Sequence, residues 1–279
     1  MTEARTERRE RRVALIIDAD NATPKLIDRM LAEAAKQGAV TIRRIYGDWT
    51  KPNMTGWKDI LNDHAIQPIQ QFRYTVGKNA TDSAMIIDAM DILHANVVDA
   101  FCIVSSDSDY TRLATRIRES GFFVMGIGEK KTPRPFVNGC NVFVYTENLV
   151  ATAPIAAAAA GPAKDAKASR APAKGKSDAK AGASVATAEV QAASAADGKE
   201  DTRALDPLLL EAFDMAVGED GWAPLGVIGN YLHRLDPGFD PRSYGFRQLS
   251  QLIRSRTELL ETKADPDHAL LVRARGERA

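Results

Sequence analysis

Closely spaced acidic and hydroxyl side chains follow an apolar run at residues 101–104. The residues directly after this run are Ser105, Ser106, Asp107, Ser108 and Asp109. A short apolar run predicts a buried parallel strand, and ligands bind at the carboxyl ends of strands in open α/β sheets. Two carboxylates at such a strand end are suited to binding a cation. Helix capping is the alternative, since Ser and Asp are preferred N-cap residues, but a cap requires only one of them.

A second group of acids follows the apolar run at residues 13–17, which ends in Asp18, Asp20 and Asn21. Asp82 opens a strongly periodic helical segment that leads into the strand at 99–104. If the strand order is 3-2-1-4-5, the first and fourth strands are neighbours at the point where the order reverses. The acids that follow both strands, together with Asp82, then share one crevice.

Four or five carboxylates in one crevice repel one another unless a cation is present. Hard oxygen ligands suit Mg²⁺ or Mn²⁺, and such a metal activates water and stabilises phosphoryl displacement. This is the chemistry of a nuclease or a phosphatase. Asp88 and Asp91 lie about 240° and 180° around the helix from Asp82, so we expect both to be structural or exposed to solvent. His64 and His94 lack partners at ligand spacing.

Strand and helix patterns alternate through the first half of the chain. Strands are predicted at 13–17, 40–46, 66–71, 99–104, 121–127 and 142–145, with helices at 23–38, 57–61, 83–93 and 108–119 and a loop at 128–140. This alternation predicts an α/β fold, a Rossmann-like parallel sheet flanked by helices, with right-handed crossovers. Gly126-Ile-Gly128 is too weak a match to indicate dinucleotide binding.

Composition changes sharply after this region. Residues 151–202 are dominated by Ala, Lys, Gly, Ser and Pro and hold no aromatic residue, so we expect a disordered linker. Helical patterns resume at 205–216, 222–234 and 246–253, and a hairpin is predicted within 259–272. Three short helices and a hairpin predict a small C-terminal winged helix-turn-helix domain over 203–275.

Charge and cysteine content exclude several classes of protein. Lys and Arg total 37 and Asp and Glu total 37, so no overall field attracts nucleic acid or a membrane surface. No apolar run approaches the ~20 residues that cross a bilayer, and the first twelve residues lack a signal-peptide core. Cys102 and Cys140 have neither disulfide-scaffold nor zinc-site spacing. We therefore expect a cytoplasmic protein with no membrane partner.

Three segments resemble the motifs of the NYN domain, which belongs to the PIN-like nuclease superfamily. They are Val13–Asn21, Gly77–Ala84 and Ser105–Tyr110. The resemblance extends over roughly residues 12–147, within a domain expected at 12–150. It implies a PIN-like fold and RNA cleavage that depends on Mg²⁺ or Mn²⁺. It also implies that the metal is bound by Asp18, Asp82, Asp107 and Asp109.

The same resemblance suggests which polar residues contact the substrate. Asn21 matches the polar residue after the first acid, and Ser106 and Ser108 flank the third motif. Lys78 is either a contact to the scissile phosphate or a solvated surface lysine. Asp20 is additional to the pattern of many family members, and its role stays open.

The C-terminal segment resembles the OST-HTH/LOTUS domain at Asp220–Gly226 and Phe239–Gly245. This family is associated with RNA binding and, in some members, with protein partners. Residues 201–279 hold 10 basic and 13 acidic residues, so RNA binding requires a local patch. The arginines close enough in sequence to form one are Arg242, Arg247, Arg254 and Arg256. The aromatic residues expected to pack in the core are Trp222, Phe239 and Tyr244.

Three functions are compatible with these features. A metal-dependent ribonuclease with a tethered RNA-binding module accounts for the most residues. A haloacid-dehalogenase-like phosphohydrolase would use Asp18-Ala-Asp20 as its nucleophile motif, with Asp107 and Asp109 on the metal, but its usual lysine and hydroxyl motifs are not apparent. A non-catalytic RNA-binding or regulatory protein is the third alternative.

Overall fold

The computed structural model describes residues 10–72, 80–151, 202–264 and 270–275. Nearly all of the linker predicted at 151–202 lies outside the described residues, and so does Lys78. The described parts form a parallel α/β sheet structure in the first half of the chain and a small helical structure with a hairpin in the last part.

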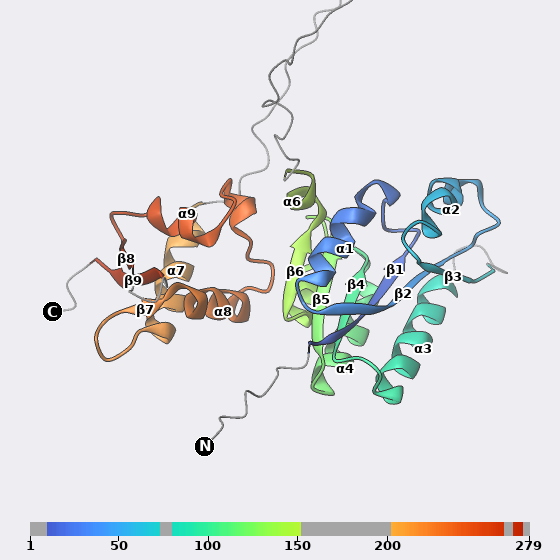
Figure 1. The fold of residues 1–279 in the computed structure, drawn as a ribbon, viewed down its shortest axis with the longest axis horizontal. Coiled ribbons are helices and arrows are strands. Elements are labelled where there is room, and N and C mark those ends of the chain that lie inside the picture. The colour runs from blue at the N-terminus through green and yellow to red at the C-terminus, as the bar shows by residue number, and fades with distance from the viewer. Residues whose placement is uncertain (1–9, 73–79, 152–201, 265–269, 276–279) are drawn as a thin grey trace, which may run out of the picture. The chain divides into compact units, whose positions relative to one another are not determined.

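A six-stranded parallel sheet forms the centre of the N-terminal part (Figure 1). Its strands in chain order are β1 (Arg12–Asp18), β2 (Ala39–Gly47), β3 (Gln67–Gln70), β4 (Ala100–Val104), β5 (Phe123–Gly128) and β6 (Val142–Tyr145). Their order across the sheet is β3-β2-β1-β4-β5-β6. The predicted order 3-2-1-4-5 is confirmed, and β6 extends it, so the carboxyl ends of β1 and β4 lie side by side.

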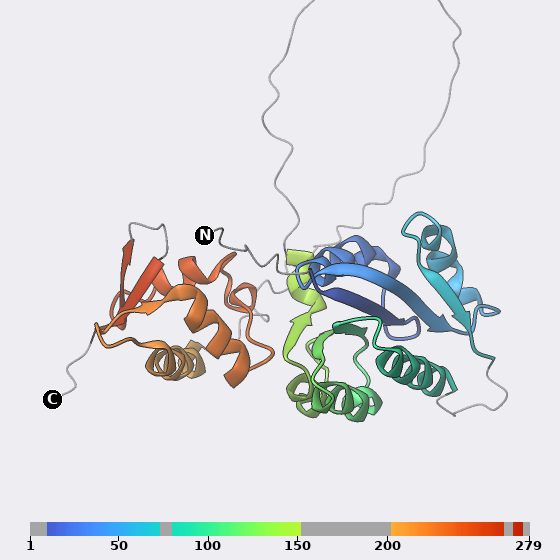
Figure 2. The ribbon, with the colours of Figure 1, turned by 60° about the horizontal axis from the view of Figure 1, so that its bottom comes forward.

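Helices cover both faces of the sheet, as Figure 2 shows. One face carries α1 (Ile27–Ala35), α2 (Thr55–Leu61) and α6 (Thr146–Ala151), and the other carries α3 (Ala80–Ala95), α4 (Thr111–Glu119) and α5 (Arg134–Gly139). Short 3-10 turns precede three of them, at η1 (Pro24–Leu26), η2 (Pro52–Met54) and η3 (Ser108–Tyr110). Within the described ranges, no helix is long and apolar enough to cross a membrane.

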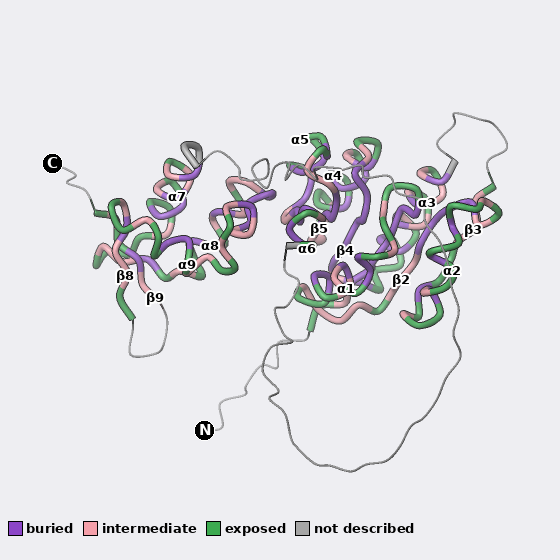
Figure 3. The backbone as a smooth tube through the Cα atoms, turned by 90° about the horizontal axis from the view of Figure 1, so that it is seen from above, coloured by how far each residue is buried: buried purple, intermediate pink, exposed green. Residues whose placement is uncertain are grey.

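The strand β1 is buried on both of its faces because helices cover both faces of the sheet. In Figure 3 the labelled strand β4 is likewise buried, with α1 on one side of the sheet and α4 and α5 on the other. Val13, Leu15 and Ile17 face the layer that contains α1. Ala14 and Ile16 face the layer that contains α3 and α4. This explains why the sequence of β1 is continuously apolar rather than alternating.

The segment predicted as a loop at 128–140 contains a short helix, α5. Pro133 occupies the N-cap position and a second proline follows within the first turn, where a missing N–H costs no helical hydrogen bond. Phe136 and Val137 are buried against the α3 and α4 layer. Burial of these two side chains stabilises a helix that its proline content alone does not suggest.

Two glycines in β5 are explained by close packing, which also accounts for the Gly126-Ile-Gly128 pattern. A Cβ on Gly126 would lie 2.3 Å from the ring of Phe143 and 2.9 Å from Sγ of Cys140. A Cβ on Gly128 would lie 2.6 Å from the carbonyl oxygen of Ser105. Both glycines therefore allow the strand to approach its neighbours.

The C-terminal part contains three helices and a small antiparallel sheet (Figure 1). The helices are α7 (Thr202–Ala216), α8 (Leu225–Leu235) and α9 (Leu249–Arg254), with a 3-10 turn at η4 (Pro241–Tyr244). The strands β8 (Leu260–Ala264) and β9 (Leu270–Ala274) form the predicted hairpin, and β7 (Ala223–Pro224) pairs with β9. This arrangement is the predicted winged helix-turn-helix with one additional short strand.

Candidate metal centre

Three segments converge at the carboxyl edge of the sheet. The strand β1 ends at Asp18, and β4 is followed by the segment from Ser105 to Asp109. Because β1 and β4 pair directly, these two strand ends are adjacent. The first turn of α3 contributes Asp82 to the same region.

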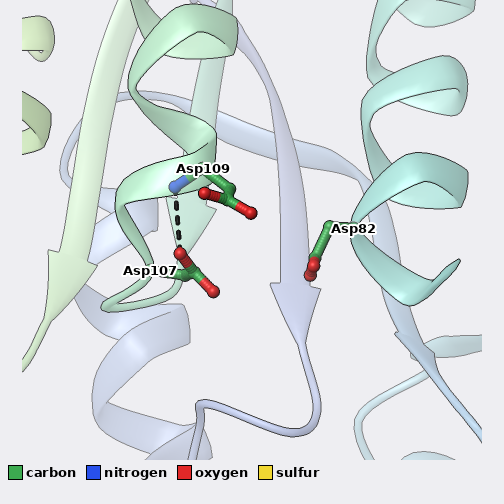
Figure 4. Close-up of side chains that lie close together, drawn as sticks. All are labelled: Asp82, Asp107 and Asp109. Carbon is green, nitrogen blue, oxygen red and sulfur yellow. Dashed lines mark hydrogen bonds between the residues drawn. The ribbon is translucent and has the colours of Figure 1, made fainter. Parts of the chain in front are cut away.

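Asp82, Asp107 and Asp109 form a compact group of carboxylates (Figure 4). Each offers an oxygen atom, and these three oxygens all lie within 4.8 Å of one another. Asp82 and Asp107 are half-buried, whereas Asp109 is exposed. Three negative charges at this separation are mutually repulsive and favour the binding of a cation.

Asp107 serves two purposes at once. Its Oδ1 accepts a hydrogen bond of 2.9 Å from the backbone N–H of Asp109, so the side chain caps η3. The cap holds the carboxylate in place beside Asp109, as the dashed line in Figure 4 shows. Capping and cation binding are therefore compatible functions of this residue.

Asp18 is completely buried at the end of β1. Its Oδ1 accepts the backbone N–H of Asp20 at 3.0 Å, and its Oδ2 accepts Asn21 Nδ2 at 2.7 Å and Ser105 Oγ at 3.0 Å. Burial raises the pKa of this carboxyl, and the hydrogen bonds from Asn21 and Ser105 oppose that rise. Asp18 is thus held rigidly and lies outside the group whose oxygens converge.

Comparisons with known proteins assign both parts of the chain to domain families. A model of the NYN domain matches residues 12–148, and a model of the OST-HTH/LOTUS domain matches residues 200–272. The chain carries an NYN domain followed by an OST-HTH/LOTUS domain. The NYN domain belongs to the PIN-like nuclease superfamily, and the parallel sheet with its flanking helices is the PIN-like α/β fold.

Two solved structures resemble parts of the chain. A protein of unknown function from Vibrio parahaemolyticus is 18% identical, with a TM-score of 0.41, and the match covers 49% of this chain and 93% of that protein. An uncharacterized protein from Nitrosomonas europaea is 34% identical, with a TM-score of 0.27, and the match covers 34% of this chain and 92% of that one. No curated protein matches.

Two residues that support the acids of the NYN domain were not identified as site residues from the sequence. Ser105 Oγ donates to Asp18 and accepts the backbone N–H of Asp107 at 3.1 Å, so it links the ends of β1 and β4. Tyr110 is buried, and its hydroxyl donates to Asp82 Oδ1 at 2.8 Å. Burial and the nearby carboxylates raise the pKa of Tyr110 well above its ordinary value, so the phenol stays protonated and donates.

The predicted polar substrate contacts of the NYN domain have different surroundings. Asn21 is exposed and donates to Asp18. Ser106 is buried, and its Oγ accepts the backbone N–H of Glu129 at 2.8 Å, which joins the ends of β4 and β5. Ser108 is exposed at the start of η3. Of Ser106 and Ser108, only Ser108 is exposed to solvent.

Three residues that the sequence did not place in the metal site have other surroundings. Asp88 accepts hydrogen bonds from Arg44 and from the hydroxyl of Tyr46, two residues of β2, so its role is structural. Asp91 is exposed. His94 contacts the carbonyl of Met90 at 2.7 Å.

The OST-HTH/LOTUS domain holds the two predicted RNA-contacting arginines differently. Arg242 is held by Asp240, whose oxygens lie 2.9 and 3.0 Å from its Nε. Arg247 is exposed to solvent. Arg247 is therefore the more accessible of the two cations.

Aromatic residues of this domain divide between core and surface. Phe239 is buried and Tyr244 packs against the same core, which confirms the prediction for both. The prediction is wrong for Trp222, which is half-buried beneath Arg273, with the guanidinium 4.9 Å from the ring centroid. Its ring lies against the hairpin that carries Arg273 because β7 pairs with β9 there.

The raised pKa of Asp18 predicts a pH-dependent contribution to stability in metal-free protein. The folded chain keeps this proton to higher pH than the unfolded chain, so the contribution is complete below the ordinary value of 3.8 and is lost as pH rises through the raised folded value. The Asp18→Asn side chain stays neutral at every pH. The free energy of unfolding of this variant should therefore increase relative to that of wild type as pH rises. Urea denaturation in EDTA at several pH values measures this difference, and a difference that is constant with pH would contradict it.

Proposed function

We propose that this protein is a divalent-metal-dependent ribonuclease whose OST-HTH/LOTUS domain binds RNA. The observation that carries the proposal is the group formed by Asp82, Asp107 and Asp109 at the carboxyl edge of an NYN domain. Converging carboxylate oxygens are ligands that a hard divalent cation prefers, and the NYN domain belongs to a nuclease superfamily. The substrate is RNA because the second domain is of an RNA-binding type.

The donor set fits a hard divalent cation. Asp82, Asp107 and Asp109 present only carboxylate oxygens, which suit Mg²⁺ or Mn²⁺ rather than soft metals. When bound, the cation supplies an activated water and charge stabilisation for phosphodiester hydrolysis. Asp18 is proposed as the fourth acid of the site, in contact with the same cation or holding its neighbours in position.

The chain's own residues orient this group. Ser105 ties Asp18 to the backbone of Asp107, and Tyr110 orients the carboxylate of Asp82. These hydrogen bonds fix the acids before substrate arrives, which lowers the reorganisation that binding and catalysis require. We propose that Asn21, Lys78, Ser106 and Ser108 contact the substrate or orient the groups that do.

The OST-HTH/LOTUS domain is proposed to capture RNA and raise its effective concentration at the acidic group. The arginines assigned to this role are Arg242 and Arg247. Because residues 201–279 hold more acidic than basic residues, binding should depend on a local patch and weaken with salt. A protein partner of this domain remains a prediction.

Ser105→Ala tests the support given to the acids. Loss of the hydroxyl leaves Asp18 and the amide of Asp107 without their shared partner, so Mn²⁺ affinity should fall about 10- to 100-fold. Titration calorimetry measures the affinity. Ser120→Ala, at the C-terminal end of α4, is the control, and equal Mn²⁺ affinity for the Ser105 variant and wild type would contradict the prediction.

Cleavage of end-labelled single-stranded RNA by the full chain tests the proposed function. Products are expected with Mn²⁺ or Mg²⁺ and none with EDTA, and their lengths distinguish internal from terminal cutting. Absence of products from folded protein on several RNAs would overturn the proposal. RNA binding without cleavage would then favour a non-catalytic RNA-binding protein.

A further inference from the structure

A cavity of about 580 Å³ opens beside Trp49, along β3 and the end of α2. Trp49, Leu61 and Ile66 form its apolar wall, and Lys58 and Asn62 contribute polar groups. Volumes of this order suit small ligands or single groups of larger ones. The cavity is separate from the group of three carboxylates and has no role in the metal site.

The indole of Trp49 is held in a fixed orientation. Its Nε1 donates to the carbonyl of Ile69 at 2.9 Å, and its backbone N–H donates to Gln70 Oε1 at 3.0 Å. Gln70 in turn donates through Nε2 to Asp48 at 3.1 Å. The ring packs against the α1 and α2 core layer yet stays half-exposed, so it presents a pre-oriented aromatic surface.

One end of the cavity, at Trp49 and Gln70, lies at the sheet edge that carries the acids. Strands in a sheet lie about 4.8 Å apart, so the end of β3 is roughly 10 Å from the end of β1 and roughly 14 Å from that of β4. Both Asp48 and the acids follow strands at this same edge. A short run of single-stranded RNA is long enough to reach the cavity and the acidic group together.

The polar groups of the cavity match the chemistry of an unpaired nucleotide. Lys58 and Asn62 are exposed, and within the part of the chain that the structure describes neither side chain has a hydrogen bond or ion pair. A lysine attracts phosphate, and an amide forms hydrogen bonds with the edge of a base. An aromatic ring stacks on the face of the base. These three groups together favour RNA over an apolar peptide.

We propose that this cavity binds an unpaired base of the RNA strand that runs past the scissile phosphate. The base stacks on Trp49, Asn62 bonds its edge, and Lys58 meets an adjoining phosphate. The inference rests on the proposed ribonuclease function and adds a substrate class to it. The enzyme would select single-stranded RNA, because only an unpaired base has its edge free to bond with Asn62 while its face stacks on Trp49.

Photo-crosslinking locates the base directly. Full-length protein in EDTA is irradiated with a short single-stranded RNA that carries 4-thiouridine, and crosslinked peptides are mapped by mass spectrometry. A crosslink at Trp49 is expected. Fluorescence anisotropy of the same RNA should show about tenfold weaker binding for Trp49→Ala and near-normal binding for Trp49→Phe.

Surface variants keep the test decisive if Trp49→Ala fails to fold. Lys58→Ala and Asn62→Ala remove exposed side chains and should also weaken crosslinking, whereas Lys25→Ala, another exposed lysine, should not. Wild-type crosslinking at other sites alone, or unchanged binding by the Lys58 and Asn62 variants, would overturn the cavity assignment. Equal affinity for mononucleotides and for the RNA would overturn it in favour of a free-nucleotide site.

The two proposals fail in different ways. Metal-dependent cleavage without a crosslink at Trp49 would retain the ribonuclease and reject the cavity. A crosslink at Trp49 without cleavage under any metal condition would retain base binding and reject the ribonuclease. Absence of both binding and cleavage would reject both.

Discussion

Asp107→Asn should lower the rate of RNA cleavage at least about 1000-fold. The substitution removes one charge from the group with Asp82 and Asp109. A bound cation stabilises the transition state by several kcal/mol, and each 1.4 kcal/mol is a factor of ten in rate. Single-turnover cleavage of end-labelled RNA with Mn²⁺ measures the loss.

The fold should survive this substitution, because Asn accepts the capping hydrogen bond from Asp109 as Asp does. Asp91→Asn is the matched control, since Asp91 is an exposed acid on α3 whose loss should leave cleavage unchanged. Full activity of a folded Asp107→Asn protein would remove Asp107 from the site. Equal losses in the Asp91 variant would point to a general charge effect instead.

Gly126→Ala should destabilise the NYN domain by about 3 kcal/mol, at the upper end of the usual cost of overpacking. The added methyl meets the buried ring of Phe143 at 2.3 Å and Cys140 at 2.9 Å, and both neighbours are fixed in the core. In a domain of this size the expected fall in Tm is about 10 °C. Calorimetry of the full chain measures it.

Gly139→Ala is the matched control in the same domain. Its Cβ would meet the side chain of Ala114 at 3.4 Å, an ordinary contact. Stability should therefore change by less than about 1 kcal/mol. A Gly126 variant as stable as the Gly139 variant would show that Phe143 shifts without cost, contrary to the packing described.

The sheet and the acids at its edge could be predicted from the sequence because both follow from simple periodicities. Continuous apolar runs mark strands that are buried on two faces, and β1 and β4 are buried in this way. Alternation with helices implies a parallel sheet, whose reversal point brings the ends of β1 and β4 together. This placed Asp107 and Asp109 beside Asp18, and Asp82 was added because its helix leads into β4; in the structure Asp82 joins Asp107 and Asp109, whereas Asp18 lies outside the group.

The supporting residues could not be identified by the same reasoning. Ser105 is one of three serines after β4, and only the pairing of β1 with β4 distinguishes it by its contact with Asp18. Tyr110 has the sequence signature of a core aromatic residue, and it is buried. Its hydrogen bond to Asp82 depends on how α3 packs against η3, which no local pattern encodes.

The different environments of the acids were also beyond sequence reasoning. Asp18 and Asp107 both follow buried strands, yet Asp18 is enclosed and Asp107 is half-exposed. Burial depends on the loop after each strand and on the helices above it. The short helix α5 was missed for a related reason, since burial of Phe136 and Val137 outweighs the local effect of two prolines.

Anomalous X-ray diffraction from crystals soaked in Mn²⁺ locates the cation without relying on activity. We predict a Mn²⁺ peak bounded by Asp82, Asp107 and Asp109 that is absent from crystals of Asp107→Asn. A well-ordered site with no peak at saturating Mn²⁺, or a peak that persists unchanged in the variant, would contradict it.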